Sequence, residues 1–482
     1  MMSSGYRMEV PMNGAAHGVR AAGVGVAARV ALTLRLRALL AALAPVVPLL
    51  GLALLLGLTL VRAAQAALPV QSWTAKTGAK VLFVEARSIP MIDLRVDFDA
   101  GSRYDPPSKA GLAALTQGLL ALGATVQNET LTEQQIADRF ADAGAQRGGS
   151  TDLDRAGVSL RTLSSRTERE AAFATLTGML AAPALGEDIL AREKARRIAA
   201  IKDEETKPEV IAERAFDRAL YGAHPYGRNQ TAASVEAITR ADVQAFYAAH
   251  YSARRAVIAI IGDLSRTEAE DLAERLTTSL PVGSAAPVLP PVPPQKGSEL
   301  RIAHPATQSH ILIGSAAIKR GDPDYFALTV GNYILGGGGF VSRLMEQVRE
   351  KRGLAYSVYS YFTPLMQEGP YQAGLQTKKE QANEALALVR KIISDYVASG
   401  PSAKELRAAK GNLVGGFALR IDSNRKILDN LSAIGFYNLP LDYLDTWSAK
   451  VEKVSVEEIR RALQKHLKPE QFSTVIVGAP DK

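Results

Sequence analysis

Cysteine is absent from this chain of 482 residues. Its absence excludes a disulfide framework, a thiolate metal site, a cysteine nucleophile and a lipid-modified cysteine. Histidine is scarce as well, and beyond residue 66 no two histidines stand three to five positions apart; these residues are His224, His250, His304, His310 and His466. Zinc sites need three or four converging ligands, so the sequence predicts no metal site in this chain.

Other catalytic signatures are missing too. The chain has neither a Gly-x-Ser-x-Gly nucleophile elbow nor a phosphate loop ending in Gly-Lys-Ser/Thr. Asp152 and Asp154 form an isolated pair of acids in a polar turn near Gly148 and Gly149, a pattern typical of a solvated loop. An independent hydrolase would therefore have to use a site that no motif reveals.

Positive charge is modest once its distribution is considered. The formal net charge is +8, but the first 66 residues contain six arginines and one glutamate, which account for +5 and leave +3 for the remainder. The sequence contains no basic stripe with interleaved aromatic residues. This pattern argues against nucleic-acid binding.

The hydrophobic residues at the N-terminus resemble an export leader. An apolar run at 38–61 follows several arginines, and Ala64-Gln65-Ala66 has the small-x-small form that signal peptidase cleaves. The pattern predicts that residues 1–66 are a signal peptide. The alternative is an uncleaved N-terminal anchor, because the run is long enough to span a bilayer, although Pro45 and Pro48 interrupt it. We expect a periplasmic protein of a Gram-negative bacterium, held at the inner membrane if the leader stays attached.

A proline-rich segment divides the rest of the chain. Residues 283–297 are predicted to be a semi-rigid linker between a first half at 67–282 and a second half at 298–482. Each half closes on a short apolar strand, at 256–263 and 473–479, and a helix precedes each strand, at 234–243 and 454–463. This similarity predicts a duplication. Strands mixed with long helices, without a regular βαβ rhythm, favour an α+β fold.

The stretch 335–362 contains the most distinctive pattern of the second half. It begins with four glycines, whose backbone can approach a ligand closely; these are Gly336, Gly337, Gly338 and Gly339. Leu344 and Val348 then recur at helical spacing until Gly353, where a left-handed cap would end the helix. Alternation from Leu354 to Phe362 predicts a strand.

This loop, helix and strand resemble the C-terminal-domain signature of the M16 zinc peptidases, the family of insulin-degrading enzyme, pitrilysin and the mitochondrial processing peptidase. In that family an arginine and a tyrosine seven positions apart contact the substrate across the cavity from the zinc. The matching residues here are Arg349 and Tyr356. The glycines would let a substrate backbone pass close by, with Phe340 as an apolar wall. The resemblance also implies two homologous α+β domains that form one half of a clamshell.

From residue types alone, these positions have ordinary explanations. An arginine near the end of a helix is commonly a partner for the helix dipole or for nearby acids such as Glu346 and Glu350. A strand tyrosine is commonly part of a core. A run of glycines is commonly a flexible surface loop.

The first half should contain the zinc centre of an active M16 enzyme. Alternation at 91–103 predicts a strand and a turn, and 109–123 predicts a helix. In active members this helix reads Gly-Leu-Ala-His-x-x-Glu-His, where the histidines bind zinc and the glutamate takes a proton from the bound water. The three positions here are Ala114, Gln117 and Gly118. None of these side chains can bind zinc in place of histidine or act as a base near neutrality.

The third zinc ligand of the family can be checked separately. It is a glutamate seven residues after an earlier one. Glu193 matches the earlier residue, and the ligand position is Ala200. A shifted register would bring in Glu204 or Glu205, but one carboxylate without histidines makes a poor zinc site.

The resemblance therefore implies a non-catalytic, substrate-binding subunit of a heterodimeric M16 zinc metallopeptidase. A zinc-bearing homologue would supply the metal and the general base, and this chain would supply Arg349 and Tyr356 to a peptide in the shared cavity. No cofactor is expected in this chain, which should be inactive alone. The alternative is a peptide-binding or scaffold protein without a catalytic partner.

Overall fold

The computed structural model describes residues 69–281 and 287–478. The predicted leader at 1–66 and the first four residues of the predicted linker lie outside the described residues. No helix in the two described ranges is long and apolar enough to cross a membrane.

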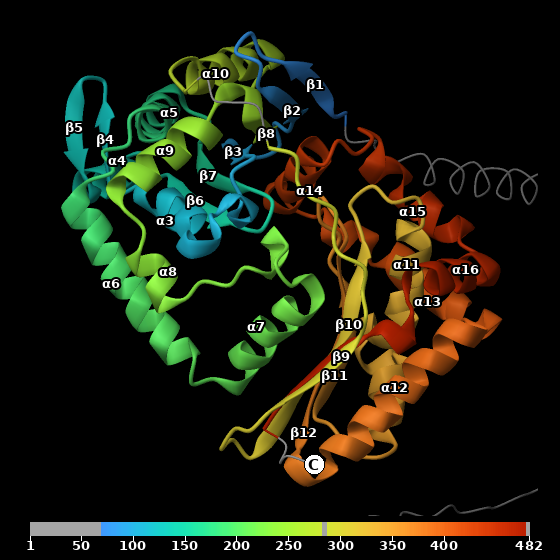
Figure 1. The fold of residues 1–482 in the computed structure, drawn as a ribbon. Coiled ribbons are helices and arrows are strands. Elements are labelled where there is room, and N and C mark those ends of the chain that lie inside the picture. Colours follow the sequence, from blue (N-terminus) through green and yellow to red (C-terminus); the bar gives the residue numbers. More distant parts are fainter. Residues whose placement is uncertain (1–68, 282–286, 479–482) are drawn as a thin grey trace, which may run out of the picture. The chain divides into compact units, whose positions relative to one another are not determined.

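Two mixed sheets organise the described residues (Figure 1). The first has the order β1-β2-β8-β3-β7-β6 and the second the order β11-β12-β10-β13-β9. The strands of the first sheet are β1 (Gln71–Thr74), β2 (Lys80–Glu85), β3 (Met91–Phe98), β6 (Gln146–Thr151), β7 (Ala156–Leu163) and β8 (Ala256–Gly262). Those of the second are β9 (Ser298–Ile302), β10 (Gln308–Ile318), β11 (Ser357–Phe362), β12 (Gly369–Lys378) and β13 (Ser473–Val477). A separate hairpin joins β4 (Gly123–Val126) to β5 (Glu129–Thr132).

The two sheets share one topology. In each, a single parallel pair lies beside a run of antiparallel strands: β2 pairs with β8 in the first sheet and β9 with β13 in the second. The strands β2, β8, β3, β7 and β6 thus correspond in order to β9, β13, β10, β12 and β11. This correspondence agrees with the predicted duplication, and the α+β fold class is confirmed.

Helices cover the sheets in both halves. In the first half they are α3 (Leu112–Leu119), α4 (Glu133–Asp142), α5 (Arg166–Ala181), α6 (Glu187–Glu204), α7 (Pro208–Tyr221), α8 (Ala232–Glu236), α9 (Arg240–His250) and α10 (Arg266–Thr278). In the second they are α11 (Tyr325–Asn332), α12 (Ala382–Ser399), α13 (Ala403–Gly415), α14 (Asn424–Phe436), α15 (Tyr443–Lys453) and α16 (Val456–His466).

The helix predicted at 234–243 is wrong in its bounds. The chain leaves α8 at Glu236 and begins α9 after Thr239, whose side chain accepts a hydrogen bond from the backbone N–H of Asp242. Ser455 caps α16 in the same way through Glu458. The helix that corresponds to α16 is therefore α9. Both begin with a capping box, in which a hydroxyl is followed three residues later by an acid. Each is also the last α-helix before the closing strand of its half, β8 or β13.

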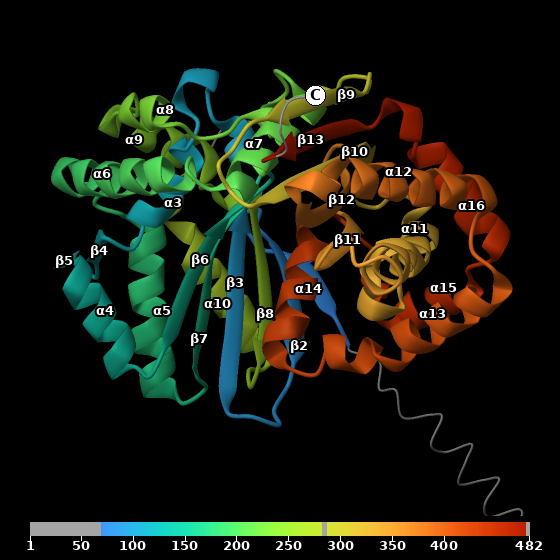
Figure 2. The same ribbon diagram turned by 90° about the horizontal axis from the view of Figure 1, so that it is seen from below.

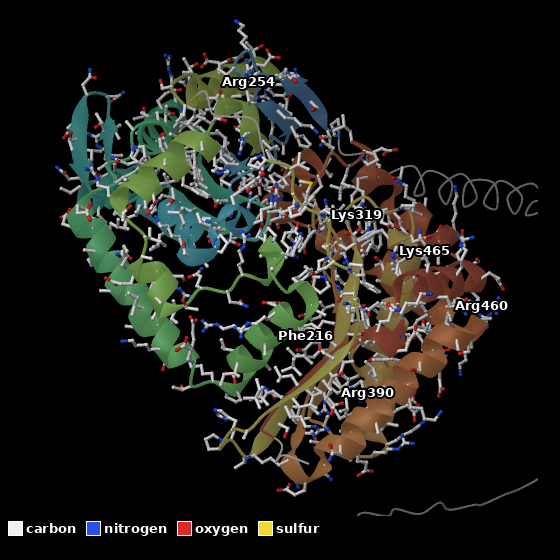
Figure 3. All side chains as sticks on the ribbon, viewed as in Figure 1. Phe216, Arg254, Lys319, Arg390, Arg460 and Lys465 are labelled. Carbon is white, nitrogen blue, oxygen red and sulfur yellow. The ribbon has the colours of Figure 1, made fainter. Side chains whose placement is uncertain are left out.

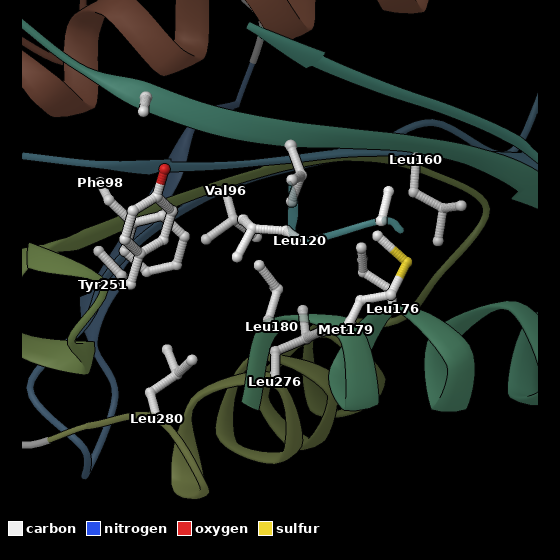
Figure 4. Close-up of a cluster of buried hydrophobic side chains, with 14 of the residues drawn as sticks. Val96, Phe98, Leu120, Leu160, Leu176, Met179, Leu180, Tyr251, Leu276 and Leu280 are labelled. Carbon is white, nitrogen blue, oxygen red and sulfur yellow. The ribbon is translucent and has the colours of Figure 1, made fainter. Parts of the chain in front are cut away.

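The core of the first half lies between its sheet and its helices. Val96 and Phe98 of β3 are fully buried, and Leu160 of β7 nearly so. Figure 4 shows them facing Leu180 of α5 and Leu276 of α10. Alternation on β3 thus directs apolar side chains to the helices, as the pattern at 91–103 predicts.

Each half lends one helix to the sheet of the other half (Figure 2). Helix α7, from the first half, contacts β10 and β13 of the second sheet, and Phe216 on its inner face, labelled in Figure 3, packs with Leu312 and Val475. Helix α14, from the second half, contacts β8, β3 and β2 of the first sheet through Leu431 and its neighbours. Apolar surface of each sheet is therefore buried only when both halves are present.

Candidate functional site

Phe340, Arg349 and Tyr356 lie together at the surface. The Arg349 guanidinium carbon is 4.9 Å from the centre of the Phe340 ring and 5.0 Å from the centre of the Tyr356 ring. The two rings are 68% and 77% exposed. We call these three residues the Arg349 cluster. The structure thus brings together the predicted arginine, tyrosine and apolar wall.

The Arg349 side chain keeps most of its hydrogen-bonding capacity. Its Nε lies 3.5 Å from a carboxylate oxygen of Glu350, an exposed neighbour. A guanidinium has five N–H donors in a fixed fork, so several remain for an incoming carbonyl or carboxylate. Cation–π contacts with two rings hold the group in place without using those donors.

The segment that carries Arg349 is helical, as predicted, but its turns are wider than those of an α-helix. Residues Met345–Glu350 form a π-helical segment in which Val348 faces the core, as does Leu344 directly before it. Such wide turns are frequent at functional sites. Gly353 follows with φ of +61°, the left-handed geometry that its position predicts. The strand begins at Ser357 rather than Leu354, so Tyr356 lies outside the ladder and its ring points into solvent.

The four glycines form part of a second π-helical turn, Tyr333–Gly337, and of the residues that follow it. A Cβ on Gly336 would overlap Ser360 Oγ and would lie 2.6 Å from the Ser360 backbone nitrogen. A Cβ on Gly337 or Gly338 would meet the preceding turn at 2.7 and 2.6 Å. Only Gly339, with φ of +60°, faces open space. Three of these glycines therefore permit close packing within the chain, and their contact with a substrate stays a prediction.

A buried hydrogen-bonded pair fixes this turn to strand β11. Asn332 Nδ2 donates to the carbonyl oxygen of Ser360 at 2.9 Å, and Ser360 Oγ donates to Asn332 Oδ1 at 2.6 Å. Both side chains are buried. The absence of a Cβ at Gly336 is what lets this pair form.

The positions that correspond to a zinc motif lie on helix α3. Ala114 and Gly118 are one turn apart on a partly exposed side, and no atom lies within 4 Å of a Cβ built on Gly118. Gln117 points to β6 and β7, where its amide donates to the Gly157 carbonyl at 3.4 Å and lies directly over Gly149. Helix α3 is shorter than the predicted 109–123, because the Asp105 carboxylate accepts the N–H groups of Gly111 and Ala113 and sets the first turn.

Two acids of helix α6, Glu193 and Glu204, are engaged in ion pairs. Ala200 is exposed on this helix. Glu193 pairs with Arg192 and Arg196, at 2.9 and 3.1 Å. Glu204 is held at 2.7 Å by both Arg197 and Arg214.

The donor set at the motif positions consists of one amide and no imidazole or free carboxylate. These residues therefore do not fit a zinc ion, which needs three or four nitrogen, sulfur or carboxylate ligands.

Among the described residues, one group has potential ligand atoms close together, namely Asp322, Asp324 and His466, all within 4.8 Å of one another. Lys465 Nζ lies 2.6 Å from Asp324 Oδ2, and His466 Nε2 lies 3.1 Å from the same oxygen. The lysine already neutralises the carboxylate that a metal would need. Sequence reasoning missed this group because His466 is 142 residues away from Asp324.

His224 has a structural role in the turn that it begins. Its Nδ1 accepts the Tyr226 backbone N–H at 3.2 Å, and its Nε2 lies 2.9 Å from the carbonyl oxygen of Pro290 in the linker. Both ring nitrogens thus have partners within the fold.

Asp154 corrects the prediction of a solvated loop. It is fully buried and accepts hydrogen bonds from Arg103 at 2.5 Å and from the Tyr226 hydroxyl at 2.6 Å, both in the first half. From the second half it accepts the Tyr437 hydroxyl at 3.0 Å and the Met366 backbone N–H at 2.8 Å. Of the two aspartates, Asp152 alone is exposed, as expected for a solvated loop. No local signal could have revealed these partners, because they are 51 to 283 residues away in sequence.

Comparison with known proteins identifies the family. The model of Insulinase (Peptidase family M16) matches residues 80–234, and the model of the Peptidase M16 inactive domain matches residues 237–413. A crystal structure of a peptidase M16 inactive domain from Pseudomonas fluorescens is 40% identical, covers 86% of this chain and 99% of that chain, and superposes with a TM-score of 0.82.

Two further relatives are more distant. The non-peptidase homolog YmxG of Helicobacter pylori is 27% identical over 410 residues, which are 83% of this chain and 92% of that protein. The periplasmic protease PqqL of Escherichia coli shares the fold at 16% identity and a TM-score of 0.73, over 85% of this chain and 45% of that one. With both family models matched, a shared topology in its two halves and the zinc-motif positions lacking ligands, this chain belongs to the M16 peptidase family.

Proposed function

We propose that this chain is the non-catalytic, substrate-binding subunit of a heterodimeric M16 zinc metallopeptidase that acts on peptides. A zinc-bearing homologue supplies the metal and the general base. This chain supplies Arg349 and Tyr356, which hold the peptide opposite the metal.

The single observation that carries the proposal is the contrast between two sites in one chain. The zinc-motif positions contain no usable ligand, whereas the Arg349 cluster is assembled and exposed. Arginine offers permanent donors and tyrosine a hydroxyl on a stiff ring, so both can grip a peptide carbonyl or stabilise a developing oxyanion.

The sheets offer a second means of binding a peptide. Strand β6 lies at one edge of the first sheet, and β11 lies at one edge of the second. An extended peptide can add to such an edge through backbone hydrogen bonds. Strand β11 begins directly after Tyr356, so a peptide paired with its edge would pass the Arg349 cluster.

The proposed location is the periplasm of a Gram-negative bacterium. The predicted leader supports it, and so does the fold shared with a periplasmic protease. Cell fractionation of a strain that produces the tagged chain tests this point, and recovery in the cytoplasm would contradict it.

The test of the split active site uses three samples: this chain, a homologue with His-x-x-Glu-His encoded beside it, and their mixture. We expect hydrolysis of a quenched fluorescent peptide in the mixture only, with zinc found in the homologue. The double variant Arg349→Gln/Tyr356→Phe should lower kcat/KM of the mixture roughly 100-fold or more, by analogy with the loss of one oxyanion donor. The complex should still form on gel filtration.

Arg352→Gln is the matched control, since Arg352 is exposed three residues away and donates to the Gln347 carbonyl at 2.9 Å. It should leave kcat/KM within twofold. Full activity of the double variant would refute the role of the Arg349 cluster. Peptide binding by this chain with no zinc-bearing partner would instead support the scaffold alternative.

A further inference from the structure

The second half contains a cavity that shares no residue with the Arg349 cluster. Its volume is about 400 Å³, and it lies between the loop that leads into α11 and the helices α15 and α16. This size suits a small organic molecule.

Aromatic side chains form one wall of the cavity. The rings of Tyr325 and Phe326 are 5.3 Å apart at nearly a right angle, and those of Phe326 and Tyr443 are 6.1 Å apart. All three side chains are only partly buried. Such a wall can accept a flat, unsaturated group by stacking or edge-to-face contact.

Four cations line the same cavity: Arg320, Lys450, Lys453 and Arg461. Among the described residues, none of the four takes part in an ion pair. Lys450 Nζ lies 5.5 Å from the Phe326 ring centre, and the Arg320 guanidinium carbon lies 5.1 Å from the Tyr437 ring centre. Arg320 Nε is buried without a hydrogen-bond partner. Two of the four cations therefore contact aromatic faces, and none of the four pairs with a carboxylate of the described residues.

The three carboxylates in the lining already have partners. Asp324 Oδ2 contacts Lys465 Nζ at 2.6 Å and His466 Nε2 at 3.1 Å. Asp322 accepts the Asp324 backbone N–H at 2.8 Å, and Glu458 accepts the Ser455 backbone N–H at 2.7 Å in a capping box. The lining contains four cations and three carboxylates, and one of these carboxylates is already paired with Lys465, so the net charge of the lining is positive.

We infer that this cavity binds a small organic anion with a flat unsaturated part, such as an aromatic carboxylate or sulfonate. The ring lies against Tyr325, Phe326 and Tyr443. The anionic group lies among Lys450, Arg461 and Arg320, where it meets donors that the protein leaves unpaired. The two features together distinguish this site from a phosphate site, which would need no aromatic wall, and from an apolar pocket, which would need no cations.

The probe for the test is 1-anilinonaphthalene-8-sulfonate, an aromatic sulfonate, and its uncharged counterpart N-phenyl-1-naphthylamine. Calorimetric titration of the purified chain should give one sulfonate site per chain. The double variant Lys450→Gln/Arg461→Gln should weaken sulfonate binding at least tenfold and leave the affinity for the uncharged probe unchanged. Both residues lie at the surface, so the variant should fold as the wild type does.

The matched control is Arg460→Gln/Lys404→Gln, which removes two exposed charges outside the lining. Arg460 is adjacent to Arg461 on α16, but its side chain lies against Gly400 and does not line the cavity. Sulfonate affinity should stay within twofold of the wild type.

Three outcomes would overturn the inference. The first is equal sulfonate affinity in the double variant and the wild type. The second is equal affinity of the wild type for the charged and the uncharged probe. The third is displacement of the sulfonate by inorganic phosphate at the same concentration, since phosphate has no ring to stack.

Discussion

Asp154 and Asp217 are carboxylates that the fold shields from water, completely for Asp154 and partly for Asp217, and their surroundings are opposite. Asp154 is met by the guanidinium of Arg103 and by two tyrosine hydroxyls. Asp217, on α7, has the acid Glu213 one turn away, and it forms no ion pair with a residue of the described ranges. Burial and Glu213 raise the pKa of Asp217 to about 7. The charge of Asp154 therefore stabilises the folded state, whereas ionisation of Asp217 destabilises it.

Asp154→Asn should destabilise the chain by about 2–3 kcal/mol, because Arg103 and two tyrosine hydroxyls lose their buried charged acceptor, although Arg103 keeps its second carboxylate, Asp99. Urea unfolding measures the effect. The control is Asp152→Asn: this side chain is 48% exposed, and asparagine keeps the oxygen that accepts its two backbone N–H groups, so the change should cost less than about 1 kcal/mol. Equal costs for the two variants would contradict the central role of Asp154.

Asp217→Asn should become more stabilising as pH rises. In the unfolded chain an aspartate has a pKa near 3.9, while in the fold the pKa of Asp217 is about 7. The folded state holds its proton between these values and the unfolded state does not, so the wild type loses stability as pH rises through this window. Asparagine cannot ionise. The advantage of the variant should grow by about 2 kcal/mol between pH 5 and pH 8.

Denaturant unfolding at the two pH values checks this prediction. Asp203→Asn serves as the control, because that side chain lies on the surface and is 69% exposed. An advantage of Asp217→Asn that is the same at pH 5 and pH 8 would show that the carboxyl group titrates in its ordinary range.

At the scale of elements, glycine has two different roles in this chain. In the turn Tyr333–Gly337 it permits a close approach to strand β11, because a Cβ on Gly336 would also lie 2.8 Å from Leu344. On helix α3, Gly118 has open space around it and serves no packing need. In a helix interior glycine is less favourable than alanine, since it loses more backbone freedom on folding.

Alanine substitutions at these two sites should therefore have opposite signs. Gly336→Ala should destabilise by about 1–3 kcal/mol through overpacking. Gly118→Ala should stabilise by about 0.5–1 kcal/mol through helix propensity. The midpoints of urea unfolding report both effects. A stabilising Gly336→Ala would mean that the turn packs less closely against β11 than described.

At the scale of the whole described molecule, the exchange of helices α7 and α14 joins the two halves. Val84, Ala259 and Ile261 of the first sheet are buried by Leu431 and its neighbours from the second half. Asp97, also buried, lies against Ser432 of α14. The halves should consequently unfold together, because separating them would expose apolar sheet surface and a buried carboxylate.

The two tryptophans of the chain permit a direct test, since Trp73 lies in the first half and Trp447 in the second. Trp73→Phe leaves fluorescence from the second half only, and Trp447→Phe leaves it from the first. In each variant, the unfolding curve followed by fluorescence should have the same midpoint as the curve followed by circular dichroism. A half that unfolds before the circular-dichroism midpoint would contradict the coupling.

The sequence alone determined the fold class, the strands β3, β8 and β13, and the lack of zinc ligands at Ala114, Gln117, Gly118 and Ala200. These features depend on local periodicity or on which atoms a side chain possesses, and neither requires a partner. The resemblance to the M16 family, and not the spacing alone, pointed to Arg349, Tyr356 and Phe340, which all lie within 17 consecutive residues.

Only the tertiary structure decided the partners of Asp154, the exchange of α7 and α14, the packing role of Gly336 and the cavity beside α15 and α16. Each of these joins residues separated by tens to hundreds of positions. Their contacts depend on how helices and sheets pack, and packing distances between remote segments leave no periodic mark on the sequence.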